Sequence, residues 1–196
     1  MEEKAKNIIS VSGIIEPCIL ERCEKFVGLL NESLEKLDNT KINDLSNNEL
    51  FITALLHILP AAVKNHQIKK LEYLRNVVIK SIMGDYDEYE IIMFLGIINN
   101  FTVWHFQLME LLDDPNKWAT DNEIRKDFST MGIMEVLNTA FPRTSKTFLR
   151  KIWDDLHQQG LVQSGDVLNT SMGGRDLIQN RTTELGIDFV SFISPI

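Results

Sequence analysis

Apolar residues recur at helical spacing through the first hundred positions of the chain, with charged residues between them. The i, i+3, i+4 pattern of these positions is typical of amphipathic helices that share a core. Polar stretches separate the repeats, and Pro17 suits the first turn of the first helix. The pattern predicts four helices with short links, and therefore a helical bundle; the expected ranges are 17–38, 50–64, 66–83 and 87–99.

Two of these helices, 50–64 and 87–99, are apolar nearly all round. A helix of that kind is usually buried on most sides, and a single small bundle does not cover both. We therefore expect a homodimer through one of them. Pro60 is expected to kink the first of the two or to end its regular part. The helix over 66–83 carries an outward row of cations, which we expect to be solvated: Lys69, Lys70, Arg75 and Lys80.

The second half of the chain also shows helical periodicity, in shorter segments. Helices are expected over about 102–112, 131–140, 148–157 and 184–194. Three polar residues are placed to accept hydrogen bonds from the first free amides of these helices, namely Thr102, Thr183 and either Thr144 or Ser145. In the helix from Phe148 to His157 the residues expected to face the core are Phe148, Ile152, Trp153 and Leu156.

The segment between the last two helices has the composition of a β-hairpin. Gly160 stops the preceding helix, Leu161-Val162 is a short apolar stretch, and Gly173-Gly174 marks the tip of a polar hairpin. The order of elements over 102–194 resembles that of a winged-helix domain. The fold class that we expect is mainly α, with an N-terminal helical bundle over 1–101 followed by a winged-helix domain with a small β-hairpin over 102–196.

The winged-helix resemblance implies binding to DNA or to other proteins. Such domains present the start of the recognition helix to the major groove, where Arg and Lys reach guanine acceptors or phosphates. Asp154 and Asp155 on the same helix would repel phosphates, so protein contacts are favoured over DNA and DNA binding is the alternative. The possible nucleic-acid-binding residues are Arg143, Lys146, Arg150 and Lys151, with Arg175 and Arg181 from the wing.

A second resemblance covers residues 14–115. Leu71-Glu-Tyr-Leu-Arg-Asn-Val-Val78 and Phe101-Thr-Val-Trp-His-Phe-Gln-Leu-Met-Glu-Leu-Leu-Asp-Asp-Pro115 are similar to patterns in helical proteins of bacteria and phages, including the abortive-infection alpha family. The segment Ile14-Ile-Glu-Pro-Cys-Ile-Leu-Glu-Arg22 belongs to the same resemblance. It implies an accessory role in phage defence and supplies no catalytic residues.

Composition and charge narrow the function further. Of 196 residues, 44% are hydrophobic and 24% are charged, as in an ordinary globular protein. The formal charge of −8 opposes non-specific binding to phosphate backbones. Cys18 and Cys23 imply no disulfide framework and are expected to be free thiols in a reducing cytosol. The apolar stretch 8–15 is too short for a transmembrane segment, so we expect a cytoplasmic protein; a peripheral membrane contact by residues 8–20 is the alternative.

The sequence contains no arrangement that is typical of catalysis or of a metal site. His57, His66, His105 and His157 occur singly, and no phosphate-binding glycine loop or nucleophile elbow is present. We therefore expect no catalytic residue, metal or cofactor. The predicted function is that of a non-enzymatic interaction or regulatory protein, with a protein partner or a second copy bound. The alternatives are a DNA-binding transcriptional regulator and an accessory factor in phage defence.

Overall fold

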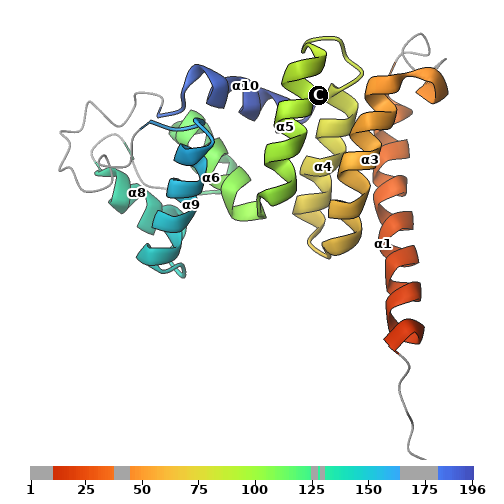
Figure 1. Ribbon diagram of the computed structural model, residues 1–196. Coiled ribbons are helices and arrows are strands. Elements are labelled where there is room, and N and C mark those ends of the chain that lie inside the picture. Colours follow the sequence, from red (N-terminus) through yellow and green to blue (C-terminus); the bar gives the residue numbers. More distant parts are fainter. Residues whose placement is uncertain (1–10, 38–44, 125–127, 129–130, 164–180) are drawn as a thin grey trace, which may run out of the picture. The chain divides into compact units, whose positions relative to one another are not determined.

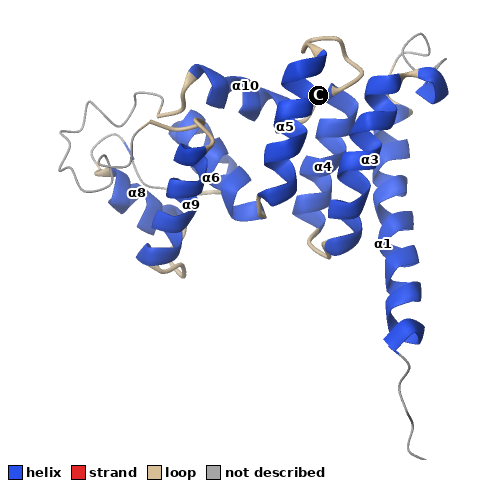
Figure 2. Ribbon diagram, in the orientation of Figure 1, coloured by secondary structure: helices blue, strands red, loops and turns tan. Residues whose placement is uncertain are grey.

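The structure is a computed structural model that describes residues 11–37, 45–124, 128, 131–163 and 181–196. The chain divides into two compact units, Met1–Asn99 and Asn100–Ile196, and each is described by itself. Every regular element of the described residues is a helix (Figures 1 and 2). The prediction of a mainly α fold is therefore confirmed.

The first unit is built from long helices that pack through aliphatic side chains. Its elements are α1 (Val11–Leu34), the short 3-10 helix η1 (Leu45–Asn47), α3 (Glu49–Lys64), α4 (Ile68–Lys80) and α5 (Glu88–Asn100). Helices α1, α3 and α4 contact one another, and Phe26, Ile58 and Leu74 are fully buried. α1 extends past the ends of α3 and α4, so that its N-terminal part lies outside the bundle (Figure 1).

Pro17 does not lie in the first turn of its helix, contrary to the sequence prediction, and Pro60 does not end α3. α1 begins at Val11, so Pro17 lies inside it, and α3 continues through Pro60 to Lys64. A proline removes one backbone donor and frees the carbonyl four residues earlier. Both prolines are exposed or nearly so, and Leu56, whose carbonyl Pro60 frees, is also exposed. Water can solvate the freed carbonyls at such positions, so the helices tolerate the prolines.

The starts of α3 and α5 are fixed by side-chain caps. Asn48 caps α3 by accepting a hydrogen bond from the amide of Phe51 at 2.9 Å. Ser46 lies in the preceding helix η1. At the start of α5, Asp87 accepts from the amide of Glu90, and Glu90 accepts from the amide of Asp87, both at 2.9 Å. This reciprocal capping box accounts for part of the acidic run before α5.

The second unit is arranged around α6 (Val103–Asp113), which contacts α7, α9 and α10. The other helices are α7 (Pro115–Asp121), α8 (Ile133–Ala140), α9 (Lys146–Gln158) and α10 (Glu184–Ile193). Trp153 of α9 is fully buried, as predicted, and Phe106 of α6 stacks on Phe189 of α10 with ring centroids 6.4 Å apart. Phe148 was expected in the core but is 39% exposed, and the buried residue of this turn is Leu149.

The winged-helix interpretation is wrong. A winged helix requires a two-stranded wing, and the part of the chain that the structure describes contains no strand. It contains an isolated antiparallel bridge between Val162 and Thr182. The predicted hairpin with Gly173-Gly174 at its tip falls on 164–180, outside the described residues. The apolar pair Leu161-Val162 is buried as a connection to α10 rather than as the start of a wing strand.

The backbone just after α9 lies unusually close to the backbone at the start of α10. Gly160 ends α9 with φ of +72°, and the amide of Thr183 donates to the carbonyl of Leu161 at 3.0 Å. Thr183 caps α10, as predicted, by accepting from the amide of Gly186 at 3.0 Å. A Cβ atom on Gly186 would lie 2.1 Å from the carbonyl oxygen of Leu161. Glycine is therefore required at position 186 for this approach.

Candidate functional site

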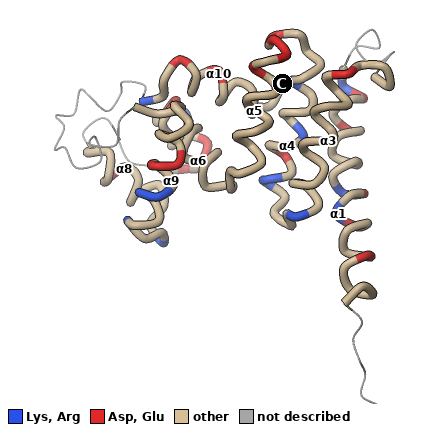
Figure 3. The backbone as a smooth tube through the Cα atoms, viewed as in Figure 1, with Lys and Arg blue, Asp and Glu red and all other residues tan. Residues whose placement is uncertain are grey.

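Four of the predicted nucleic-acid-binding residues lie together on the surface at the start of α9. Arg143, Lys146, Arg150 and Lys151 are exposed, and basic positions of α9 are visible in Figure 3. The start of the helix is fixed by Ser145, whose hydroxyl accepts from the amide of Phe148 at 3.2 Å.

The two residues predicted to extend this basic surface do not join it. Arg175 lies outside the described residues. Arg181 is 8% exposed, its backbone amide donates to the carbonyl of Leu112 at 3.4 Å, and it lies beside a cavity. Because its side chain is nearly buried, Arg181 does not add to the exposed basic surface at the start of α9.

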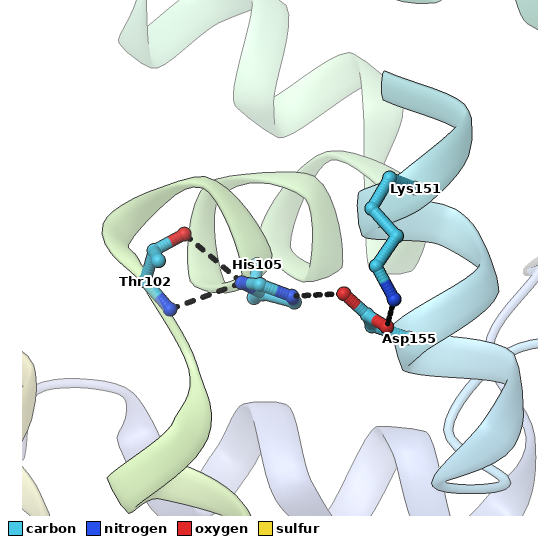
Figure 4. Close-up of polar contacts among 4 residues, drawn as sticks. All are labelled: Thr102, His105, Lys151 and Asp155. Atoms are coloured by element: carbon cyan, nitrogen blue, oxygen red, sulfur yellow. Dashed lines mark hydrogen bonds and ion pairs between the residues drawn. The ribbon is translucent and has the colours of Figure 1, made fainter. Parts of the chain in front are cut away.

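Part of the basic surface is engaged in a polar cluster that links α9 to α6 (Figure 4). Lys151 donates to Oδ1 of Asp155 one turn further along α9. Oδ2 of Asp155 lies 3.5 Å from Nε2 of His105, which is buried on α6. On the other side of the ring, Nδ1 of His105 lies 3.0 Å from both the amide nitrogen and the hydroxyl of Thr102. The cluster therefore runs in the order Thr102, His105, Asp155 and Lys151.

The charge state of Asp155 follows from these contacts. Partial burial opposes its charged form, but the hydrogen bond and charge of Lys151, together with the hydrogen bond of His105, outweigh burial. They hold the pKa of the Asp155 carboxyl below its ordinary value. A stable carboxylate here neutralises part of the charge that Lys151 would present to a polyanion.

The geometry around His105 is that of a helix cap. The amide of Thr102 can only donate, so Nδ1 of His105 accepts and the neutral ring carries its proton on Nε2, facing Asp155. A general base needs a free lone pair, and Nδ1 already uses its lone pair on that amide. Phe101 stacks on the ring with centroids 4.4 Å apart and an angle of 10° between the planes. These contacts fix the position of His105 at the first turn of α6.

A small cavity lies among α6, α7 and α8. The centre of a water-sized molecule has about 20 Å³ in which to move, which is room for about one water. Its lining is aliphatic or aromatic apart from Arg181; it comprises Leu111, Leu112, Pro115, Phe128, Ile133, Val136, Leu137 and Arg181. Within the described part of the chain, no three His, Cys, Asp or Glu residues are placed to hold a metal ion.

Lys70, predicted to be solvated, is instead buried in the first unit. Its side chain is 2% exposed, and Nζ donates to the carbonyl of Ile98 in the last turn of α5 at 3.0 Å. Burial lowers the pKa of Lys70 from 10.5 to about 7. Lys69, Arg75 and Lys80 from the same predicted row are half-buried. The row therefore does not form one solvated basic face.

The largest run of exposed apolar side chains belongs to the N-terminal part of α1. We call residues 11–21 of this helix the α1 overhang, since it projects beyond α3 and α4 (Figure 1). Glu16 is the sole charged residue of positions 11–20. The exposed fractions are 68% for Val11, 57% for Ile14, 48% for Ile15, 46% for Ile19 and 60% for Leu20.

Sequence reasoning noted residues 8–20 as a possible membrane contact but did not predict the α1 overhang, because Pro17 was placed at the start of the helix. The signal was present, since Val11, Ile15, Cys18 and Arg22 continue the helical spacing that leads to Phe26 and Leu30 in the core. One of the two helices over 50–64 and 87–99 was expected to form a dimer interface. Both bury most of their apolar side chains within the first unit. Their exposed apolar residues are Leu56, Tyr89, Ile92 and Met93.

Comparison of the chain with family models, with curated proteins and with solved structures finds no match. The resemblance to helical proteins of phage defence therefore has no support from these comparisons. No helix among the described residues combines the length and the hydropathy that are needed to cross a membrane.

Proposed function

We propose that the protein is a non-enzymatic interaction protein that binds another polypeptide through the α1 overhang. The observation that carries this proposal is the exposure of five aliphatic side chains on a helix segment with one charged residue in ten. Contiguous exposed apolar patches of this kind mark interaction sites on proteins. Four of the five, namely Val11, Ile14, Ile15 and Ile19, lie within about 140° of the helix circumference, which suits a helix that docks in an apolar groove or against another helix.

The burial of these side chains would supply part of the binding free energy. Full burial of an aliphatic side chain is worth about 1.5–3 kcal/mol, so each half-exposed residue of the overhang offers about 1 kcal/mol. The five together offer about 5 kcal/mol before the cost of association. A partner that also satisfies the exposed polar rim, which includes Glu16 and Glu21, would gain further affinity.

Three observations favour a polypeptide over DNA as the partner. The formal charge of −8 repels a polyanion, Lys151 is paired with Asp155, and Arg181 is buried. The exposed cations at the start of α9 are thus few, and the charge of Lys151 is partly neutralised by Asp155. These features disfavour the DNA-binding alternative. The apolar side chains of the overhang, by contrast, remain exposed in the described part of the chain.

Site-specific photo-crosslinking tests the proposal. A benzophenone amino acid replaces Ile15 in the overhang, and a control chain carries it at Glu24, which is exposed on the other side of α1. We expect a discrete covalent adduct to a polypeptide from position 15 and none from position 24, in cells that express the protein. Equal labelling from the two positions, or no adduct from position 15, would contradict the proposal.

A further inference from the structure

We propose that the occupant of the α1 overhang is the overhang of a second copy of this chain, packed antiparallel about a two-fold axis. This inference rests on the proposed function, because it names the partner of the same surface. It uses the spacing of the apolar residues, the area that they expose and the position of the charges around the helix.

The spacing of the overhang suits a helix–helix seam. Val11, Ile15, Cys18 and Arg22 follow one another at intervals of four, three and four residues, which are the core positions of a heptad pattern. The seam ends at Arg22, whose guanidinium turns to its own unit and donates to the carbonyl of Val63 at 3.1 Å. Antiparallel pairing sets Ile15 of one copy against the smaller Cys18 of the other.

The exposed area matches what a weak specific dimer requires. At about 100° per residue, Leu20 lies on the opposite side of the helix from this seam, so the four other exposed aliphatic residues contribute roughly 300–400 Å² per copy, which is in the range of functional surface patches. Two copies facing each other would bury at most about 800 Å², which is the size of a weak or transient interface. A two-fold interface uses the same patch twice, so no second apolar surface on the protein is needed. The expected dimer is therefore a reversible one.

The charges of the overhang are compatible with such a seam. At about 100° per residue, Glu16 lies about 120° around the helix from the line through Val11, Ile15 and Cys18. The two copies of Glu16 would therefore stay in solvent and not face each other. A membrane surface is disfavoured as the occupant, because helices that lie on anionic lipid carry Lys or Arg on their polar face. The overhang carries Glu16 and Glu21 instead.

The first experiment measures the oligomeric state of the full chain. Light scattering after gel filtration, from about 1 to about 500 µM, is expected to show a concentration-dependent dimer. Ile15→Glu should weaken it by at least about tenfold in Kd, since it places a carboxylate on each side of the seam. Leu56→Glu is the matched control, because Leu56 is 71% exposed on α3 and lies outside the overhang. Circular dichroism checks that both variants keep their helices.

The second experiment tests the antiparallel orientation. Ile15→Cys is expected to form an intermolecular disulfide with the native Cys18 under mild oxidation, faster than Glu24→Cys does. Adding Cys18→Ser to Ile15→Cys should remove most of this product. If the cross-link persists in the double variant, the orientation is parallel and the proposed seam is wrong.

The remaining outcomes separate this inference from the proposed function. A chain that stays monomeric over the whole range overturns the dimer, and a benzophenone adduct of Ile15 to a different polypeptide then leaves the proposed function standing. A dimer that survives Ile15→Glu unchanged overturns the seam. Co-sedimentation of the monomer with vesicles that contain anionic phospholipid, lost in Ile15→Glu, would identify lipid as the occupant and overturn both proposals.

Discussion

Replacing Lys70 with methionine is expected to make the stability of the first unit less dependent on pH. In the folded protein the Lys70 ammonium is buried beside the carbonyl of Ile98, and its pKa is about 7 in place of 10.5. The folded state therefore releases this proton above pH 7, whereas the unfolded chain keeps it up to about pH 10.5. Between these values the unfolded state binds more protons, so the stability rises with pH.

The size of the effect follows from the pKa difference. Each pH unit well between the folded and unfolded pKa values is worth about 1.4 kcal/mol, and the group is half titrated at pH 7, so raising the pH from 7 to 9 should add about 2 kcal/mol to the free energy of unfolding. Below pH 7 both states hold the proton and the contribution is constant. Lys70→Met retains much of the apolar volume and removes the titrating group, so this rise should disappear.

Urea unfolding followed by circular dichroism, at several values between pH 6 and pH 9, measures the slope. Lys69→Met is the matched control, since Lys69 is half-buried one position earlier and should leave the slope unchanged. Tryptophan fluorescence supplies a second control, because all three tryptophans are in the second unit. A wild-type slope that equals that of Lys70→Met between pH 7 and pH 9 would refute the reasoning.

Three further predictions concern the second unit, and each uses unfolding followed by tryptophan fluorescence. Gly186→Ala should destabilise it by about 2–3 kcal/mol or more, because a Cβ atom would lie 2.1 Å from the Leu161 carbonyl oxygen; a loss no larger than that of Gly160→Ala would contradict this. Thr183→Ala removes the cap of α10 and should cost about 1 kcal/mol, with no loss if another group caps the helix. Asp155→Asn should destabilise the protein at neutral pH. The pKa of Asp155 is lowered in the folded state, so the stability that its carboxylate contributes is lost as the pH falls through that pKa. The difference in unfolding free energy between wild type and Asp155→Asn should therefore shrink in acid. A difference that stays constant with pH would show that the Asp155 carboxylate is not stabilised in this way.

Local rules predicted the helices well because helix formation is a local property. The 3.6-residue period identified α3, α4, α5 and α9, and hydroxyl side chains at Ser145 and Thr183 marked helix starts that the structure confirms. The same rules placed Pro17 at a helix start, although it lies inside α1. A proline is tolerated within a helix where water can solvate the freed carbonyl, and that depends on exposure, which the tertiary fold decides.

The wing prediction had a different origin. Gly160 and the apolar pair Leu161-Val162 fit the end of a recognition helix, and both features are present in the structure. The same features also fit a helix end that is held against the start of α10 by the hydrogen bond from Thr183 to Leu161 and by the close approach of Gly186. The choice between a strand and a helix end of this kind depends on a contact between segments more than twenty residues apart, and no local pattern contains that contact.

The candidate site was the hardest part to predict, because cations on helices were treated as surface charges. Arg22 donates to the carbonyl of Val63 in the last turn of α3, and Lys70 donates to that of Ile98 in the last turn of α5. The carbonyls at a helix C-terminus lack helical donors and carry partial negative charge, so a cation from a neighbouring helix is stabilised there. The partners in these pairs are 41 and 28 residues apart in the sequence. A count of Lys and Arg on helical faces therefore overestimates the basic surface of this protein.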